Sequence, residues 1–128
     1  MSREVQRRAV GRLRAVIIDV SDLDRAAAFW SAMFGEEAGE RRGQYRTIGK
    51  PPTSRTGGPA VVLQQVPEAK VGKARLHLDF ECEDLDAAIG FVEELGGSKV
   101  HTLTEGGFSL IVAADTEGNE FCLIPNSG

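Results

Sequence analysis

The chain has 128 residues, 41% of them apolar, which is enough to bury one compact core. Its 15 basic and 19 acidic side chains give a net charge of −4, which argues against a nucleic-acid-binding surface. We find no apolar stretch typical of a signal peptide or membrane span and only two cysteines, so we expect a single cytoplasmic domain with free thiols, no disulfide framework and no membrane partner.

The first residues of the chain are rich in arginine. Five arginines lie within the first fourteen positions: Arg3, Arg7, Arg8, Arg12 and Arg14. Such a cluster is compatible with an RNA- or membrane-seeking segment, but a solvated terminus is the simpler interpretation. We therefore expect residues 1–13 to form a flexible basic arm.

A strand and a helix are predicted to open the folded part of the chain. Residues 14–20 are rich in β-branched side chains, which predicts a strand. Ser21 is expected to cap the following helix, whose apolar residues recur at helical spacing until Gly35. Three further strands are expected: a weak one near Glu37–Arg41, then Gln44–Ile48 and Ala60–Val66. The intervening residues 50–59 contain prolines and glycines typical of an exposed loop.

The second half of the chain repeats this order after a linker at residues 67–73. Residues 75–82 alternate between polar and apolar side chains, as in a half-buried strand. An amphipathic helix should begin near Leu85 and end at Gly96 and Gly97. Three strands are expected to follow, at Lys99–Leu103, Phe108–Ala113 and Glu120–Ile124.

The two halves are related in sequence by a constant shift. Asp22 and Asp84 begin similar segments and are 62 positions apart, since 84 − 22 = 62; Phe29 and Phe91 have the same spacing. This self-similarity predicts a duplicated unit. The unit reads βαβββ, with module 1 at about 14–67 and module 2 at about 74–125, within one domain spanning 14–128.

Three motifs resemble a known family. They are His77-Leu78-Asp79, Gly118-Asn119-Glu120-Phe121-Cys122 and Leu63-Gln64-Gln65-Val66-Pro67-Glu68. With the duplicated unit, they resemble the glyoxalase-like and bleomycin-resistance-type members of the vicinal oxygen chelate superfamily. The resemblance implies an α+β fold of two tandem βαβββ modules, whose curled mixed sheets form a half-open barrel around a pocket. It also implies a homodimer, in which the modules of one chain either close on each other or exchange between two chains.

Side-chain alternation predicts which residues face that pocket, because residues two apart share a sheet face. In the strand at 75–82 the apolar face should pack beneath the helix; it comprises Leu76, Leu78, Phe80 and Cys82. The opposite face should line the pocket, with Arg75, His77, Asp79 and Glu81. By the same reasoning, the pocket receives Ala15, Ile17 and Asp19 from the first strand, Gln64 from the strand at 60–66, and Glu120 and Cys122 from the last strand.

The resemblance implies four inward side chains that hold a divalent metal such as Zn, Ni, Fe or Mn. His77 matches one imidazole ligand, whereas its counterpart Ala15 offers no donor atom. Gln64 stands where a carboxylate or amide ligand is usual, and Cys122 takes the place of a glutamate. The implied metal set is therefore His77, Gln64 and Cys122, and it is incomplete.

Other residues of the predicted pocket suit metal-free chemistry. His77 with Asp79 or Glu81 forms a candidate catalytic group for proton transfer. Candidate substrate-binding residues are Asp19, Gln64, Arg75, Tyr45 and Glu120. The carboxylates Asp19, Asp79 and Glu81 would repel one another unless cations such as Arg75 and Arg46 pair with them. A structural salt-bridge network explains the carboxylates as well as an acid–base arrangement does.

Three functions remain open, each with a small molecule as ligand or substrate. The first is an atypical, metal-independent enzyme of the lyase or isomerase type, acting through His77 and nearby carboxylates. The second is sequestration of an antibiotic or metabolite without catalysis. The third is a divalent-metal-dependent enzyme of the glyoxalase or dioxygenase type.

Overall fold

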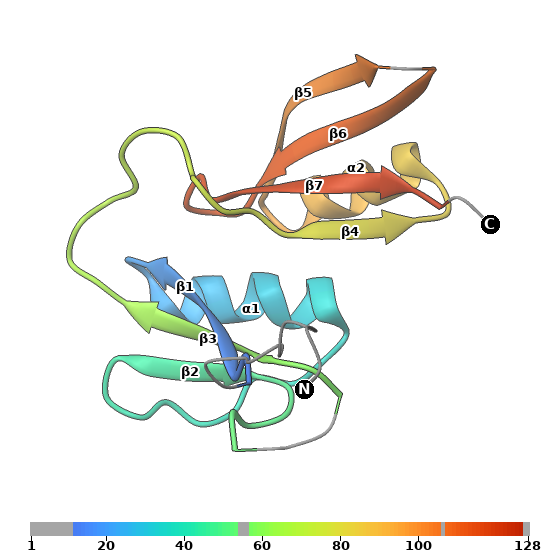
Figure 1. The fold of residues 1–128 in the computed structure, drawn as a ribbon. Helices are drawn as coiled ribbons and strands as arrows, with labels where there is room; N and C mark the ends of the chain where they lie inside the picture. Colours follow the sequence, from blue (N-terminus) through green and yellow to red (C-terminus); the bar gives the residue numbers. More distant parts are fainter. Residues whose placement is uncertain (1–11, 54–56, 106, 127–128) are drawn as a thin grey trace, which may run out of the picture.

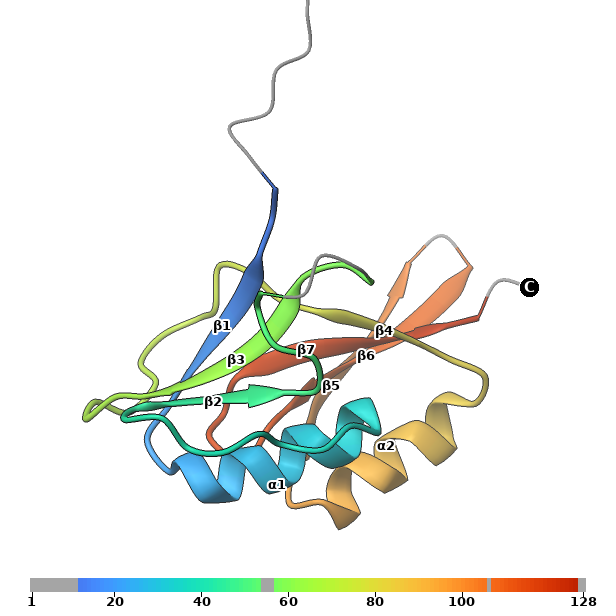
Figure 2. The same cartoon turned by 90° about the horizontal axis from the view of Figure 1, so that it is seen from below.

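The computed structural model describes residues 12–53, 57–105 and 107–126. Two mixed sheets and two helices make up the α+β fold, and neither sheet closes on itself. In Figure 1 the first module lies below and the second above, and the linker connects them at the left. Both helices lie on one side of the molecule and the strands on the other (Figure 2).

The first module contains one helix, α1 at Leu23–Phe34. Its sheet has the order β1-β3-β2, with β1 parallel and β2 antiparallel to β3. The three strands are β1 (Ala15–Val20), β2 (Tyr45–Ile48) and β3 (Ala60–Gln65). The weak strand expected near 37–41 is absent among the described residues, because only isolated bridges form there, from Ala38 to Ile48 and from Arg42 to Tyr45.

The second module contains α2 at Leu85–Glu94 and a sheet in the order β4-β7-β6-β5. Its strands are β4 (Asp79–Cys82), β5 (Ser98–Glu105), β6 (Phe108–Ala114) and β7 (Glu120–Pro125). This module has the complete βαβββ order, and the first module has one strand fewer. The strand expected at 75–82 is only half as long, since its ladder with β7 begins at the pair Asp79 and Cys122.

The duplication is visible at the helix starts. Asp22 caps α1 by accepting a hydrogen bond from the Arg25 amide at 3.1 Å, and Asp84 caps α2 in the same way from the Ala87 amide at 3.1 Å. The expectation that Ser21 caps α1 is therefore wrong. The Asp22 carboxylate accepts from the first turn of α1, while the Ser21 hydroxyl donates to Glu117.

The core lies between the helices and the adjacent faces of both sheets. Trp30 on α1 is 1% exposed and joins the modules, because its ring lies 5.3 Å from that of Phe121 and 6.3 Å from that of Phe80, centroid to centroid. Trp30 is thus a central residue of the core. Leu63 and Leu123 are also buried on this side, which confirms the predicted alternation in β3 and β7.

One predicted core residue is misplaced. Leu76 was expected beneath α2, but it is 90% exposed. It precedes the β4 ladder, so the two-residue alternation that orients Phe80 does not extend to it. Leu78, the next residue of the same face, does pack against the core.

Candidate functional site

Three side chains with metal-ligand chemistry converge on the face of β4 and β7 that points away from the helices. They are His77, Asp79 and Cys122, whose nearest nitrogen, oxygen and sulfur donors all lie within 4.8 Å of one another. The His77 Nε2 atom lies 3.4 Å from Asp79 Oδ1. The convergence follows from the fold, because Asp79 pairs directly with Cys122 in the parallel ladder and His77 precedes Asp79 by two residues.

The three groups differ in their access to solvent. The side chains of His77 and Asp79 are 55% and 56% exposed, whereas Cys122 is buried. Burial raises the pKa of the Cys122 thiol above its ordinary value, and its hydrogen bond to Asp79 and the charges of Asp79 and Glu120 raise it further. Cys122 is therefore a protonated thiol near neutral pH, beside two accessible polar groups.

The cluster borders a cleft between the two modules. The β1 and β4 strands are edge strands of their sheets, and the cleft between β1 and residues 74–78 has a volume of about 610 Å³. Its walls are mainly apolar, with Trp30 and Phe121 among them. Its polar lining residues are Asp19, Arg75, His77, Asn119 and Glu120. Cavities of this size and composition accommodate small organic ligands.

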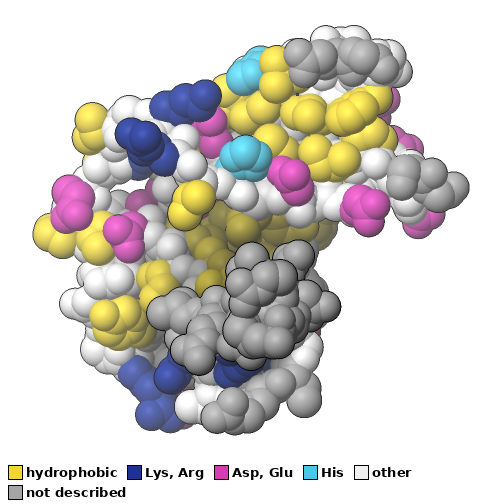
Figure 3. Space-filling model, viewed as in Figure 1, with side chains coloured by type: hydrophobic (Ala, Val, Ile, Leu, Met, Phe, Trp, Pro, Cys, Tyr) yellow, Lys and Arg dark blue, Asp and Glu magenta, His cyan; other side chains and the backbone are white. Residues whose placement is uncertain are grey.

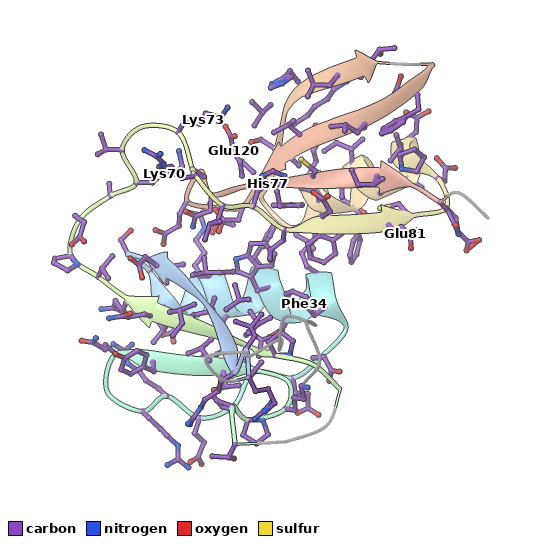
Figure 4. The ribbon with its side chains drawn as sticks, viewed as in Figure 1. Phe34, Lys70, Lys73, His77, Glu81 and Glu120 are labelled. Atoms are coloured by element: carbon purple, nitrogen blue, oxygen red, sulfur yellow. The ribbon has the colours of Figure 1, made fainter. Side chains whose placement is uncertain are left out.

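Several predicted site residues lie at this cleft. Asp19, Arg75, His77 and Glu120 line it, and Figure 4 places His77 close to Glu120 near the start of β7. Asp79 and Cys122 adjoin it through the donor cluster. Glu81 is exposed at the far end of β4 in Figure 4, and neither this cleft nor the donor cluster includes it.

Two predicted residues lie on the first sheet instead. Tyr45 and Gln64 form a cross-strand row with Asp19, through the pairs Asp19–Gln64 and Gln64–Tyr45. Gln64 belongs to neither the donor cluster nor the cleft lining, and the third donor of the cluster is Asp79 instead. Arg46 contacts Asp24 at 3.4 Å, so it does not pair with the carboxylates near His77.

Sequence reasoning did not assign a role to the turn at Asp115–Asn119. The Asn119 amide nitrogen donates to the Asp19 carbonyl at 3.2 Å and so connects β1 to the second module beside the cleft. The Glu117 carboxylate accepts hydrogen bonds from the Ser21 and Asp22 amides, both at 2.6 Å. Gly118 and Asn119 tolerate positive φ and so indicated a tight turn, but nothing in the local sequence indicated its distant partners.

Comparison with known proteins agrees with this architecture. A crystal structure of a glyoxalase/bleomycin resistance protein/dioxygenase family enzyme from Burkholderia phytofirmans PsJN is similar, with a TM-score of 0.69, 18% identity, and coverage of 90% of this chain and 98% of that chain. Another similar structure is a mutant of the fosfomycin resistance protein FosX from Listeria monocytogenes, complexed with Mn(II) and 1S,2S-dihydroxypropylphosphonic acid. Its TM-score is 0.70 at 17% identity, with coverage of 91% of this chain and 90% of that chain.

At these identities the structural likeness establishes the fold alone. A comparison with curated proteins finds no significant match. No helix among the described residues is long and apolar enough to cross a membrane.

The family model described as the glyoxalase-like domain matches residues 15–124, which include both modules and every member of the donor cluster. The chain therefore belongs to the glyoxalase-like domain family.

Proposed function

We propose that this protein binds a divalent cation at His77, Asp79 and Cys122 and acts on a small oxygen-bearing molecule in the adjoining cleft, as a lyase- or isomerase-type enzyme. The observation that carries the proposal is the convergence of the three donors within 4.8 Å. The sequence alone favoured metal-free catalysis or ligand sequestration over a metal site, because Ala15 removes one expected ligand. Asp79 supplies a donor in that incomplete set.

The donor chemistry fits a metal of intermediate softness. One imidazole, one carboxylate and one thiolate make a three-ligand set, which is the number found in catalytic zinc sites with an open position. Half of the His77 and Asp79 surfaces face solvent, so a ligand has access to the site. A bound cation would supply Lewis-acid polarisation of a substrate oxygen.

The surrounding residues have roles of their own. The sulfur of Cys122 ligates a metal only as a thiolate. Because the pKa of this thiol is raised, we expect metal affinity to increase with pH. Trp30 and Phe121 form apolar cleft walls that exclude water from a bound ligand. Arg75, Asn119 and Glu120 offer polar contacts that would orient it.

A metal-free acid–base enzyme is the second candidate function, and the contact between His77 and Asp79 favours it. A carboxylate oxygen 3.4 Å from Nε2 orients the imidazole for proton transfer. Glu81 is less suited to this role, since the donor cluster does not include it. Sequestration of a ligand in the cleft without chemistry is the remaining alternative.

Calorimetric titration of the metal-stripped protein with Zn²⁺, Ni²⁺, Fe²⁺ and Mn²⁺ separates these functions. The chain contains two histidines and two cysteines, so His101→Ala and Cys82→Ser are matched controls for His77→Ala and Cys122→Ser. We expect one stoichiometric cation, lost in His77→Ala and Asp79→Ala and retained in both controls. Failure of every cation to bind at micromolar concentration would reject the metal site and leave metal-free catalysis or sequestration.

We also propose that the protein is a homodimer. Exposed apolar side chains on the second sheet support this, because Leu103 and Phe108 are 48% and 50% exposed on β5 and β6. Figure 3 shows hydrophobic side chains gathered over this part of the upper module. Light scattering of the wild type and of Leu103→Ser gives the test, and a wild-type monomer would contradict the proposal.

A further inference from the structure

A second and larger cavity lies on the first sheet. Its volume is about 1270 Å³, and it covers the face of β1, β3 and β2 that points away from α1. The described residues that line it include three arginines and no carboxylate. The arginines are Arg12, Arg14 and Arg42.

These three guanidinium groups have no anionic partner among the residues that the structure describes. The two ion pairs found there join Arg46 to Asp24 and His77 to Asp79. Arg41 differs from its neighbour Arg42, because the Arg41 side chain donates to the Gly43 carbonyl and to Gln65. Three guanidinium groups without an anionic partner among the described residues therefore border one cavity, in a chain whose net charge is −4.

The remaining walls of the cavity are largely apolar. Ile17 and Leu13 are 50% and 64% exposed there, which leaves aliphatic surface in contact with solvent. Tyr45, at 42% exposure, adds an aromatic ring and a hydroxyl group. Ile17 also lines the cleft next to His77, so the two cavities adjoin at β1.

We propose that this cavity binds a small amphiphilic anion, whose carboxylate or phosphate head contacts Arg14 and Arg42 and whose apolar body lies on Ile17 and Tyr45. Guanidinium groups suit this role because their planar set of N–H donors matches the oxygens of carboxylates and phosphates. The aliphatic wall selects for an attached apolar group over a free inorganic anion. The inference goes beyond the proposed function and requires no metal.

The test uses four probes of equal chain length with metal-stripped, full-length protein: hexanoate, hexyl phosphate, hexan-1-ol and hexylammonium. Calorimetry or ligand-observed NMR should show binding of hexanoate, hexyl phosphate or both, and the relative affinity of these two identifies the preferred head group. Hexan-1-ol and hexylammonium should bind about tenfold more weakly or not at all. Equal binding of hexan-1-ol, or no binding of either anion at millimolar concentration, would overturn the inference.

Variants locate the site. The double variant Arg14→Gln/Arg42→Gln should lose about tenfold or more of its affinity for the anion, whereas Arg25→Gln, an exposed position on α1 outside both cavities, should bind as the wild type does. In the wild type, the anion should shift the methyl NMR signals of Ile17 and Val62 but not those of Leu103. This second readout does not depend on the folding of a variant. Unchanged binding in the double variant, or shifts at Leu103 alone, would contradict the proposal.

Failure of this inference is distinguishable from failure of the proposed function. His77→Ala should bind the anion normally even if it loses Zn²⁺. Anion binding without any metal binding would support the arginine site and reject the metal site. Anion binding that disappears in His77→Ala and persists in the arginine double variant would assign the anion to the β4–β7 face and reject the inference.

Discussion

The indole Nε1 of Trp30 donates a hydrogen bond to the Asp115 carboxylate at 3.1 Å, across 85 positions of the chain. Asp115 is 4% exposed and also accepts hydrogen bonds from the Glu117 and Asn119 amides, both at 2.8 Å. A buried carboxylate with these partners orders the turn before β7 and attaches it to α1 of the other module. The turn at Asp115–Asn119 and helix α1 are therefore one structural unit.

The variant Asp115→Ala should be strongly destabilised. It leaves the buried Trp30 N–H and two turn amides without acceptors, and each hydrogen bond to a charged group contributes about 1.5–3 kcal/mol. We expect a loss of about 3 kcal/mol or more in the free energy of unfolding, measured in urea. Trp30 is the only tryptophan of the chain, so its fluorescence reports the transition directly. Wild-type stability in Asp115→Ala would show that the turn is not a structural link.

Glu117 should stabilise α1 from the other module. Its carboxylate accepts hydrogen bonds from the Ser21 and Asp22 amides and from the Ser21 hydroxyl, which places a negative charge at the start of the helix. We expect Glu117→Ala to cost about 1–2 kcal/mol in the free energy of unfolding. Glu117→Gln should cost less, because it keeps one acceptor oxygen. Equal stabilities of wild type and both variants in urea unfolding would contradict this role.

Two glycines near α2 should respond to alanine in opposite directions. A Cβ atom on Gly97 would lie 2.5 Å from the Ala114 carbonyl oxygen and 2.7 Å from Val92 Cγ1, whereas one on Gly90 would meet nothing within 4 Å. Gly97→Ala should therefore lower the free energy of unfolding by about 1–3 kcal/mol through overpacking. Gly90→Ala should raise it by about 0.5–1 kcal/mol, because alanine favours the helix interior. Thermal unfolding of Gly97→Ala and Gly90→Ala measures both changes. Wild-type stability in Gly97→Ala would contradict the close packing around this glycine.

His77→Ala should leave the fold almost unchanged. The side chain is 55% exposed, and its contact with the equally exposed Asp79 is screened by solvent. We expect a change within about 0.5 kcal/mol in the free energy of unfolding, as for other exposed positions. Circular dichroism melting of His77→Ala beside His101→Ala provides the measurement. A cooperative loss of structure in His77→Ala alone would mean that the imidazole is part of the core.

The stability of the protein should decrease in alkaline solution because of its two thiols. Burial raises the pKa of Cys82, and burial together with Asp79 and Glu120 raises the pKa of Cys122. As pH increases, the unfolded chain therefore releases these thiol protons first. The stabilisation that the protonated thiols give to the folded state is complete below the ordinary thiol pKa, about 8.5. It is lost as the pH rises through the higher pKa values of the folded protein.

Urea unfolding at a series of pH values checks this dependence. The double variant Cys82→Ser/Cys122→Ser should show a flatter alkaline profile than the wild type, because the other titrating groups are common to both. The same pH series should show slow alkylation of both thiols by iodoacetamide in the folded protein, since the thiolate is the reactive form. Parallel stability profiles for the wild type and the double variant would contradict the raised pKa values of Cys82 and Cys122.

Much of the fold could be predicted from the sequence. The shift of 62 positions identified two related modules, and Asp22 and Asp84 do begin the two helices in the same way. Alternation placed Glu120 and Cys122 on the pocket face of the last strand, and Phe121 and Leu123, which alternate with them, do lie in the core; β3 follows the same rule. These features depend on interactions within a few residues, or on the fixed two-residue period of a strand.

The site could be predicted only in part. His77 and Cys122 were placed on the correct side of the sheet, but alternation does not state which strands are neighbours. Only the register of β4 on β7 brings Asp79 beside Cys122 and leaves Gln64 on another sheet. In the same way, Arg14 lies just before β1 and Arg42 just before β2. They line one cavity because both strands belong to the first sheet. The sequence determined the faces through local periodicity, and the tertiary structure decided which side chains meet, because strand pairing and module packing join residues that are distant along the chain.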